Sequence, residues 1–162
     1  MDQTTLAATV ARLAAIEDIK QLKARYCAYC DQDYDPDGLA ALFVDNGVWD
    51  GGAEFGRHEG RAAIRSFFRG ASGSIVFAAH LVMNPIIEVE GDGDRASGRW
   101  RLLMPCTVQG RDAAPEARWL LSAYDERYVR VDGRWLFASL EVDTQFYAAH
   151  LAGWAAATAA RG

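Results

Sequence analysis

Three side chains in this sequence could together transfer protons: Tyr26, Asp31 and His80. Tyr26 and Asp31 lie near the end of one amphipathic segment, and His80 follows about fifty residues later in an apolar stretch. A buried imidazole with a carboxylate and a phenol nearby can act as a general base or acid without a cofactor. If the fold brings the three together, we expect a small enzyme that needs no cofactor.

Each of these residues also has a purely structural interpretation. Strand-like alternation places His80 on the same apolar face as Val76 and Ala78, so its ring could be a core histidine whose nitrogens bind backbone groups. Asp31 stands at the negative end of a helix dipole and could simply begin the turn that follows. Tyr26 lies on the apolar stripe of the helix, where core packing is the common role.

The Cys27-x-x-Cys30 pair is not expected to be a redox or metal site. Redox pairs of this spacing stand at helix N-termini, where the dipole lowers the thiol pKa, whereas this pair lies near the C-terminal end of a long helix. A metal site would need further ligands, such as Cys106 and His80, and the sequence has no second paired motif. We therefore predict no metal, and we expect the two thiols to pack a helix face.

The apolar pattern predicts helices first and strands later, which is typical of an α+β fold. The predicted helices cover residues 5–31, 39–43 and 60–68, a hairpin covers 47–58, and the predicted strands cover 75–90, 96–108, 116–131 and 134–146. Tight turns are expected at 91–94 and 132–133, and a loop at 109–115. Acidic residues precede basic ones over 16–23, which indicates an exposed helical face.

The composition is that of one globular domain, residues 1–162. The chain is 51% hydrophobic with a net charge of −5, so it can bury a core but lacks the basic patch that nucleic acid requires. No run of about 20 apolar residues could span a bilayer. The first residues do not resemble a secretion signal, and an odd number of cysteines suits a reducing compartment. We expect a cytoplasmic protein with no nucleic-acid or membrane partner.

Four segments of the chain resemble the SnoaL-like branch of the nuclear-transport-factor-2-like superfamily. They are IEDIKQLKARY at residues 16–26, GRAAIRSFF at 60–68, SGRW at 97–100 and YDERYVRVDGRW at 124–135. The resemblance implies a cone-shaped fold in which a curved antiparallel sheet wraps around N-terminal helices and encloses one deep apolar pocket. Residues 1–14 would then be an N-terminal helical extension, and residues 147–162 a C-terminal tail.

Within that branch, the chain looks most like bile acid 7α-dehydratases, with scytalone dehydratase and hexachlorocyclohexane dehydrochlorinase further away. The catalytic tyrosine, aspartate and histidine of these enzymes fall on Tyr26, Asp31 and His80. A further aspartate of the dehydratases is replaced here by Met104, and their substrate-orienting arginine has no counterpart near Thr144. The resemblance therefore implies an Asp–His pair that catalyses an elimination on a substrate different from bile acids.

The expected activity is a cofactor-independent, dehydratase-type elimination on a small hydrophobic aromatic or polycyclic hydroxylated substrate. Retro-aldol cleavage of an aryl-propane diol, with loss of formaldehyde, would use the same base and pocket. The fold would also suit a non-catalytic small subunit of an aromatic-ring dioxygenase, or a ligand-binding protein. The resemblance further implies a homodimer or homotrimer. The predicted substrate-binding residues are Trp49, Phe55, Trp100, Leu102, Met104 and Cys106.

Overall fold

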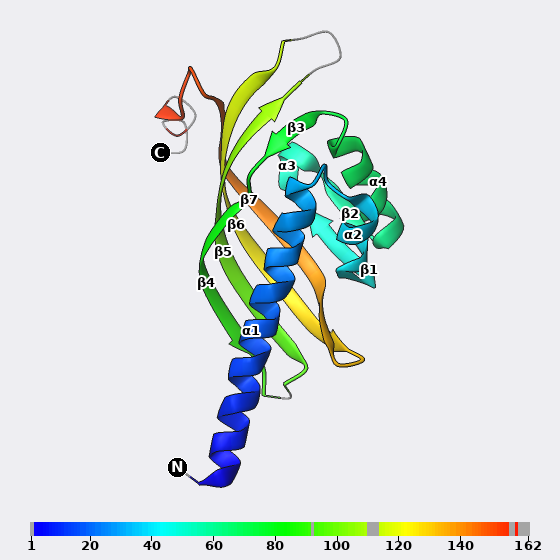
Figure 1. Ribbon diagram of the computed structural model, residues 1–162, viewed down its shortest axis with the longest axis vertical. Coiled ribbons are helices and arrows are strands. Elements are labelled where there is room, and N and C mark those ends of the chain that lie inside the picture. The colour runs from blue at the N-terminus through cyan, green and yellow to red at the C-terminus, as the bar shows by residue number, and fades with distance from the viewer. Residues whose placement is uncertain (1, 92, 110–113, 156–157, 159–162) are drawn as a thin grey trace.

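The protein is described by a computed structural model over residues 2–91, 93–109, 114–155 and 158. Helices lie on one side of a strongly curled sheet (Figure 1). The helices are α1 Gln3–Asp31, α2 Pro36–Ala41, α3 Gly52–Phe55 and α4 Arg61–Ala71. The strands are β1 Phe43–Asp50, β2 Arg57–Glu59, β3 Ile75–Ala78, β4 Leu81–Val89, β5 Arg95–Val108, β6 Glu116–Val131 and β7 Arg134–Ala149.

The sheet is mixed, which corrects the expectation of a purely antiparallel one. Its strands follow the order β2-β1-β7-β6-β5-β3, and β4 also pairs with β5. The pairing of β1 with β7 is parallel, with Trp49 next to Leu140. Most of the chain separates these two strands, so no short turn forces them to run in opposite directions. The rest of the predicted α+β architecture is confirmed.

Helix α1 buries only its C-terminal half. Asp2 caps its start by accepting a hydrogen bond from the Thr5 amide at 2.7 Å. Ile19 and Leu22 are fully buried, whereas Leu6 and Val10 remain about half exposed. In Figure 1 the first turns of α1 extend beyond the sheet. The helix therefore continues through the segment predicted as an N-terminal extension.

The strand predicted over residues 75–90 is divided into β3 and β4. At the break, the Ala79 amide donates to the Pro105 carbonyl at 3.1 Å, and the His80 amide turns away from the sheet. Ala78 is buried as the alternation predicts, but Val76 is 51% exposed. The expectation that Val76 and His80 share a buried apolar face is therefore wrong, because the regular alternation ends before the histidine.

The other predicted boundaries are close to those observed. Helix α2 begins earlier than expected because the Asp35 carboxylate caps it, accepting from the Asp37 and Gly38 amides at 3.1 Å. Strand β7 continues to Ala149, into the segment predicted as a tail. Asp92 of one predicted turn, residues 110–113 of the predicted loop, and residues 156–157 and 159–162 of the tail lie outside the described residues. Within the described ranges, no helix has the length and apolar character needed to cross a membrane.

Candidate active site

The inner face of the sheet and the helices enclose a cavity of about 250 Å³. Alternate residues of β5 and β6 point into the protein and supply one wall, and helices α1 and α4 supply another. The lining is mostly aromatic and aliphatic. It includes Tyr26, Tyr34, Trp49, Phe55, Phe68, His80, Leu102, Met104, Tyr124 and Tyr147. Such a cavity suits a small ligand with an apolar body.

Asp31 and His80 form a hydrogen-bonded pair at this cavity. Asp31 is the last residue of α1, and His80 stands at the break between β3 and β4. Their atoms Oδ1 and Nδ1 lie 2.7 Å apart. The Asp31 carboxylate also accepts the His80 backbone N–H, at 3.0 Å and 3.2 Å to its two oxygens. One carboxylate therefore fixes both the ring and the backbone of the histidine; the sequence led us to expect the contact with the ring but not the one with the backbone.

The hydrogen bond to Asp31 determines which ring nitrogen is available. An ionised carboxylate only accepts hydrogen bonds, so Nδ1 of His80 carries the proton in this contact. The other nitrogen, Nε2, has no hydrogen-bond partner in the described part of the chain. The His80 side chain is only 5% exposed, while that of Asp31 is 35% exposed. A ring so oriented at an apolar cavity can accept a proton from a ligand through Nε2.

Tyr26 lies in the wall of the same cavity. Within the described residues, it forms no hydrogen bond with Asp31 or His80. Its hydroxyl accepts a hydrogen bond from the Trp49 indole N–H at 2.9 Å. Burial raises the pKa of Tyr26 well above its ordinary value, so the phenol keeps its proton. Tyr26 can therefore donate that proton in a hydrogen bond to a ligand oxygen, while Trp49 fixes its position.

The structure separates the predicted substrate-binding residues into two groups. Trp49, Phe55, Leu102 and Met104 line the cavity. Trp100 and Cys106 are buried but are not part of the lining. The Trp100 indole instead donates to the Tyr128 hydroxyl at 2.9 Å.

Tyr34 is a cavity residue that sequence reasoning missed. Its ring stacks on Phe68 with centroids 6.0 Å apart and meets the His80 ring edge-on at 5.9 Å. Asp33 and Tyr34 both adopt left-handed backbone conformations, with φ of 54° and 52°. Non-glycine residues rarely adopt this conformation, which turns the chain sharply after α1. The sequence shows only a polar turn here, so no local pattern indicates that the tyrosine turns inward. Tyr124 and Tyr147 were missed as well.

A buried ion pair lies beside the cavity. Lys23 Nζ and Glu126 Oε1 are 2.5 Å apart, and both side chains are almost completely buried. The lysine ammonium also lies 3.3 Å from the centroid of the Tyr124 ring, and the Tyr128 hydroxyl donates to Glu126. Lys23 was expected on an exposed helical face, and that expectation is wrong because β6 supplies a carboxylate partner on the inner side.

Cys30 and Cys106 are buried thiols, and the Cys27 thiol is partly buried. Burial raises the pKa of Cys27 to about 11 and raises the pKa of Cys30 well above its ordinary value. The pKa of Cys106 is raised for the same reason. Within the residues that the structure describes, no three histidine, cysteine, aspartate or glutamate side chains gather closely enough to hold a metal ion.

These pKa values predict slow alkylation of the native protein. With a pKa of about 11, roughly one Cys27 thiol in a thousand is ionised at pH 8. Because the thiolate is the reactive form, we expect iodoacetamide to label the native chain at least about 100-fold more slowly than the urea-unfolded chain. Mass spectrometry over time measures both rates. Rapid labelling of Cys27 in the native protein would show that a reactive thiol had been overlooked.

The curled sheet, the helices and the enclosed cavity define a nuclear-transport-factor-2-like fold, also called cystatin-like. The sequence profile described as "SnoaL-like domain" matches residues 11–141. The chain belongs to this SnoaL-like family, which confirms the resemblance found in the sequence.

Solved structures of similar fold agree with this assignment. A scytalone dehydratase-like protein from Novosphingobium aromaticivorans is 25% identical with a TM-score of 0.75, over 86% of this chain and 90% of that one. A hexachlorocyclohexane dehydrochlorinase, LinA type 2, is 18% identical with a TM-score of 0.77, over 87% and 92%. An NTF2-like protein from N. aromaticivorans is 27% identical with a TM-score of 0.70, over 98% and 96%.

No protein with a curated function matches the chain. The LinA likeness, at 18% identity, shows the fold alone. Together with the family match, the structure at 25% identity supports a lyase-type family, because it is a scytalone dehydratase-like protein.

Proposed function

We propose that this protein is a lyase that eliminates water from a small hydroxylated aromatic or alicyclic compound by general acid–base catalysis. The observation that carries the proposal is the Asp31–His80 hydrogen bond of 2.7 Å at the edge of an apolar cavity. A single base with a charged partner is sufficient for an elimination, since the substrate supplies both the proton and the leaving group.

In this reaction His80 takes one proton from the substrate and later gives the same proton back. Nε2 removes a proton from the substrate carbon next to the one that bears the hydroxyl group. The electron pair of that C–H bond forms the new double bond as the C–O bond breaks. Asp31 stabilises the imidazolium that forms, and His80 returns the proton to the departing hydroxide, which leaves as water. The enzyme ends in its starting protonation state.

Phenols in the cavity are the hydrogen-bond donors for the departing oxygen. Burial raises the pKa values of Tyr26, Tyr34 and Tyr124, so all three remain protonated at neutral pH. The Tyr34 ring contacts the His80 ring directly, which places a phenol beside the base. Hydrogen bonds to an oxygen that gains negative charge stabilise the transition state more than the ground state. These tyrosines therefore stabilise the leaving oxygen while His80 removes the proton.

The cavity volume limits the substrate. At about 250 Å³ the space lies below the roughly 300–1,000 Å³ that is usual for pockets of drug-sized ligands. A compound with one or two rings therefore fits better than a four-ring steroid. Met104 and Leu102 make one wall apolar, which favours a flat hydrocarbon surface on the substrate.

The experiment is a turnover screen with the purified chain alone. Hydroxylated one-ring and two-ring compounds are incubated with the protein, and water loss is followed by mass spectrometry. The proposal requires turnover by the isolated chain. Activity only in the presence of an iron-containing partner, or tight binding of several compounds without turnover of any, would contradict it.

Replacing Asp31 with Asn should lower turnover by roughly 10- to 100-fold on any substrate that the screen identifies. The amide keeps the shape of the carboxylate but cannot stabilise an imidazolium charge. Steady-state kinetics should show the loss mainly in kcat, because Asp31 is not part of the cavity lining. Asp33→Asn, an exposed neighbour, is the matched control and should keep full activity. Equal activity of the two variants would show that Asp31 has no part in catalysis.

A further inference from the structure

The buried ion pair of Lys23 and Glu126 lies behind the aromatic wall of the cavity. Lys23 is three residues before Tyr26 on α1, so the two side chains point to the same side of the helix. The Lys23 ammonium lies 4.7 Å from the centroid of the Tyr26 ring and 3.3 Å from the centroid of the Tyr124 ring. Both phenols line the cavity, whereas Lys23 does not. One positive charge therefore contacts two rings of the cavity wall from the outside.

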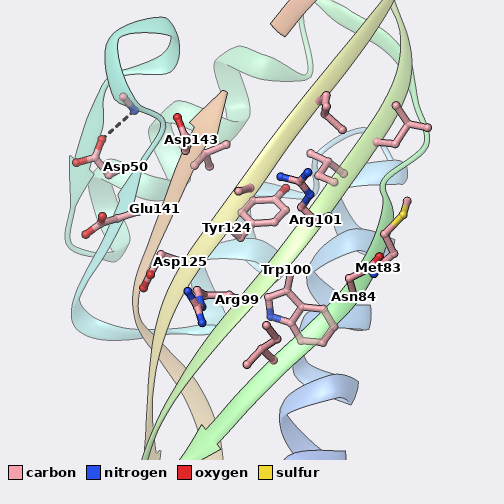
Figure 2. A pocket seen from close by; sticks show the side chains of 17 residues that line it. Asp50, Met83, Asn84, Arg99, Trp100, Arg101, Tyr124, Asp125, Glu141 and Asp143 are labelled. Carbon is pink, nitrogen blue, oxygen red and sulfur yellow. Dashed lines mark hydrogen bonds between the residues drawn. The ribbon is translucent and has the colours of Figure 1, made fainter. Parts of the chain in front are cut away.

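The carboxylate of the pair is directed away from the cavity. Glu126 and Tyr128 follow Tyr124 at every second position of β6, and all three are buried. The Tyr128 hydroxyl donates to Glu126, and the Trp100 indole N–H donates to that hydroxyl at 2.9 Å. Figure 2 labels Trp100 and Tyr124, which are paired across the neighbouring strands β5 and β6. Glu126, Tyr128 and Trp100 are not part of the cavity lining, so the positive end of the ion pair is the end nearer to the cavity.

A charge in this position acts on the hydroxyl groups of the two phenols. The Lys23 and Glu126 side chains are 2% and 0% exposed, so water does not screen their charges. A cation over the face of an aromatic ring attracts the π electrons of that ring. The hydroxyl group of a phenol polarised in this way is a stronger hydrogen-bond donor. It therefore gives more stabilisation to an oxygen that becomes negative in the cavity.

We propose that Lys23 is a positioning residue for the elimination, and that it acts through Tyr26 and Tyr124 to stabilise negative charge on a ligand oxygen. Because this role rests on the proposed function, the oxygen concerned is that of the departing hydroxyl group. Glu126 holds the ammonium in place, and its own charge offsets only part of the effect because it lies farther from the cavity. The cavity lining contains no charged side chain other than His80 when protonated. The cavity should therefore bind a phenolate more tightly than the corresponding phenol.

The one-ring compound 4-nitrophenol tests this preference without any turnover. It ionises near neutral pH, and only its phenolate absorbs visible light, so a pH titration of the bound compound gives the ratio of phenolate affinity to phenol affinity. Lys23→Met/Glu126→Leu removes both charges and should lower the ratio about threefold, because the two charges partly cancel. Glu126→Gln removes only the negative charge and should raise the ratio about tenfold.

Opposite shifts distinguish a charge effect from a structural one, because a distorted cavity would weaken the binding of both forms. His80 is the same in all the proteins compared. Burial raises the pKa values of Cys27 and Cys30, so these nearby thiols stay neutral during the titration. Lys20→Met/Glu17→Leu is the matched control. It makes the same substitutions in an exposed ion pair of α1, whose charges lie 3.7 Å apart, and it should leave the ratio unchanged.

Kinetics and folding complete the test. On any substrate that the wild type turns over, Lys23→Met/Glu126→Leu should lower kcat about threefold and leave KM unchanged, because the effect is on the transition state. Circular dichroism verifies that each variant is folded, and if one variant is not, the direction of the shift in the other decides. A ratio that moves the same way in both variants, or in neither, would overturn the inference. A wild type that does not bind 4-nitrophenol would overturn it too, whereas the turnover screen decides the proposed function separately.

Discussion

Replacing His80 with Gln should reduce kcat by about 10²–10⁴-fold on any substrate that the wild type turns over. The glutamine amide can keep a hydrogen bond to Asp31 but cannot take a proton from carbon. His80 is the histidine that lines the cavity, and its Nε2 has no partner in the described part of the chain. No other described cavity residue carries an imidazole or an amine, so little activity should remain.

Steady-state kinetics on wild type and variant measure the effect. His150→Gln is the control, because His150 is exposed and its Nδ1 accepts a hydrogen bond from Trp119 at 2.9 Å, away from the cavity. The thermal midpoint of His80→Gln should stay close to that of the wild type, which separates loss of chemistry from loss of fold. Full activity of the His80 variant would eliminate the proposed mechanism, whatever the substrate.

The sequence was sufficient to predict the pairing of Asp31 with His80. It was not sufficient to predict that the Asp31 carboxylate also binds the backbone N–H of His80. The resemblance to the family placed the two residues together. Local alternation, by contrast, placed His80 within a continuous strand, whereas its amide leaves the sheet and binds the Asp31 carboxylate. A carboxylate 49 residues away satisfies that amide, and strand periodicity contains no information about such a contact.

The residues that escaped prediction share a physical cause. Tyr34 enters the cavity because two consecutive non-glycine residues adopt left-handed conformations, which local sequence preferences disfavour. Lys23 looked like part of an exposed, charged helical face, because its partner Glu126 is 103 residues away. In both cases long-range contacts override a local tendency. The long helix and the strands, whose patterns extend over many residues, were predicted closely.

The second large effect concerns stability. Replacing Lys23 with Met should lower the free energy of unfolding by about 3–5 kcal/mol, because Glu126 would remain buried without its partner. The Lys23 and Glu126 side chains are 2% and 0% exposed, so water cannot replace the lost contact. The variant also loses the ammonium that lies 3.3 Å from the Tyr124 ring centroid. Urea unfolding followed by tryptophan fluorescence measures the change.

A double variant separates the cost of an unpaired charge from the value of the pair. Lys23→Met/Glu126→Leu removes both charges and should recover most of the lost stability, since a buried ion pair contributes little more than well-packed apolar side chains. Lys20→Met is the matched surface control, because Lys20 pairs with Glu17 at 3.7 Å on the exposed side of α1. It should change the stability by less than about 0.5 kcal/mol. A double variant as unstable as Lys23→Met would show that the contacts of Glu126 with Lys23 and with Tyr128 together stabilise the fold.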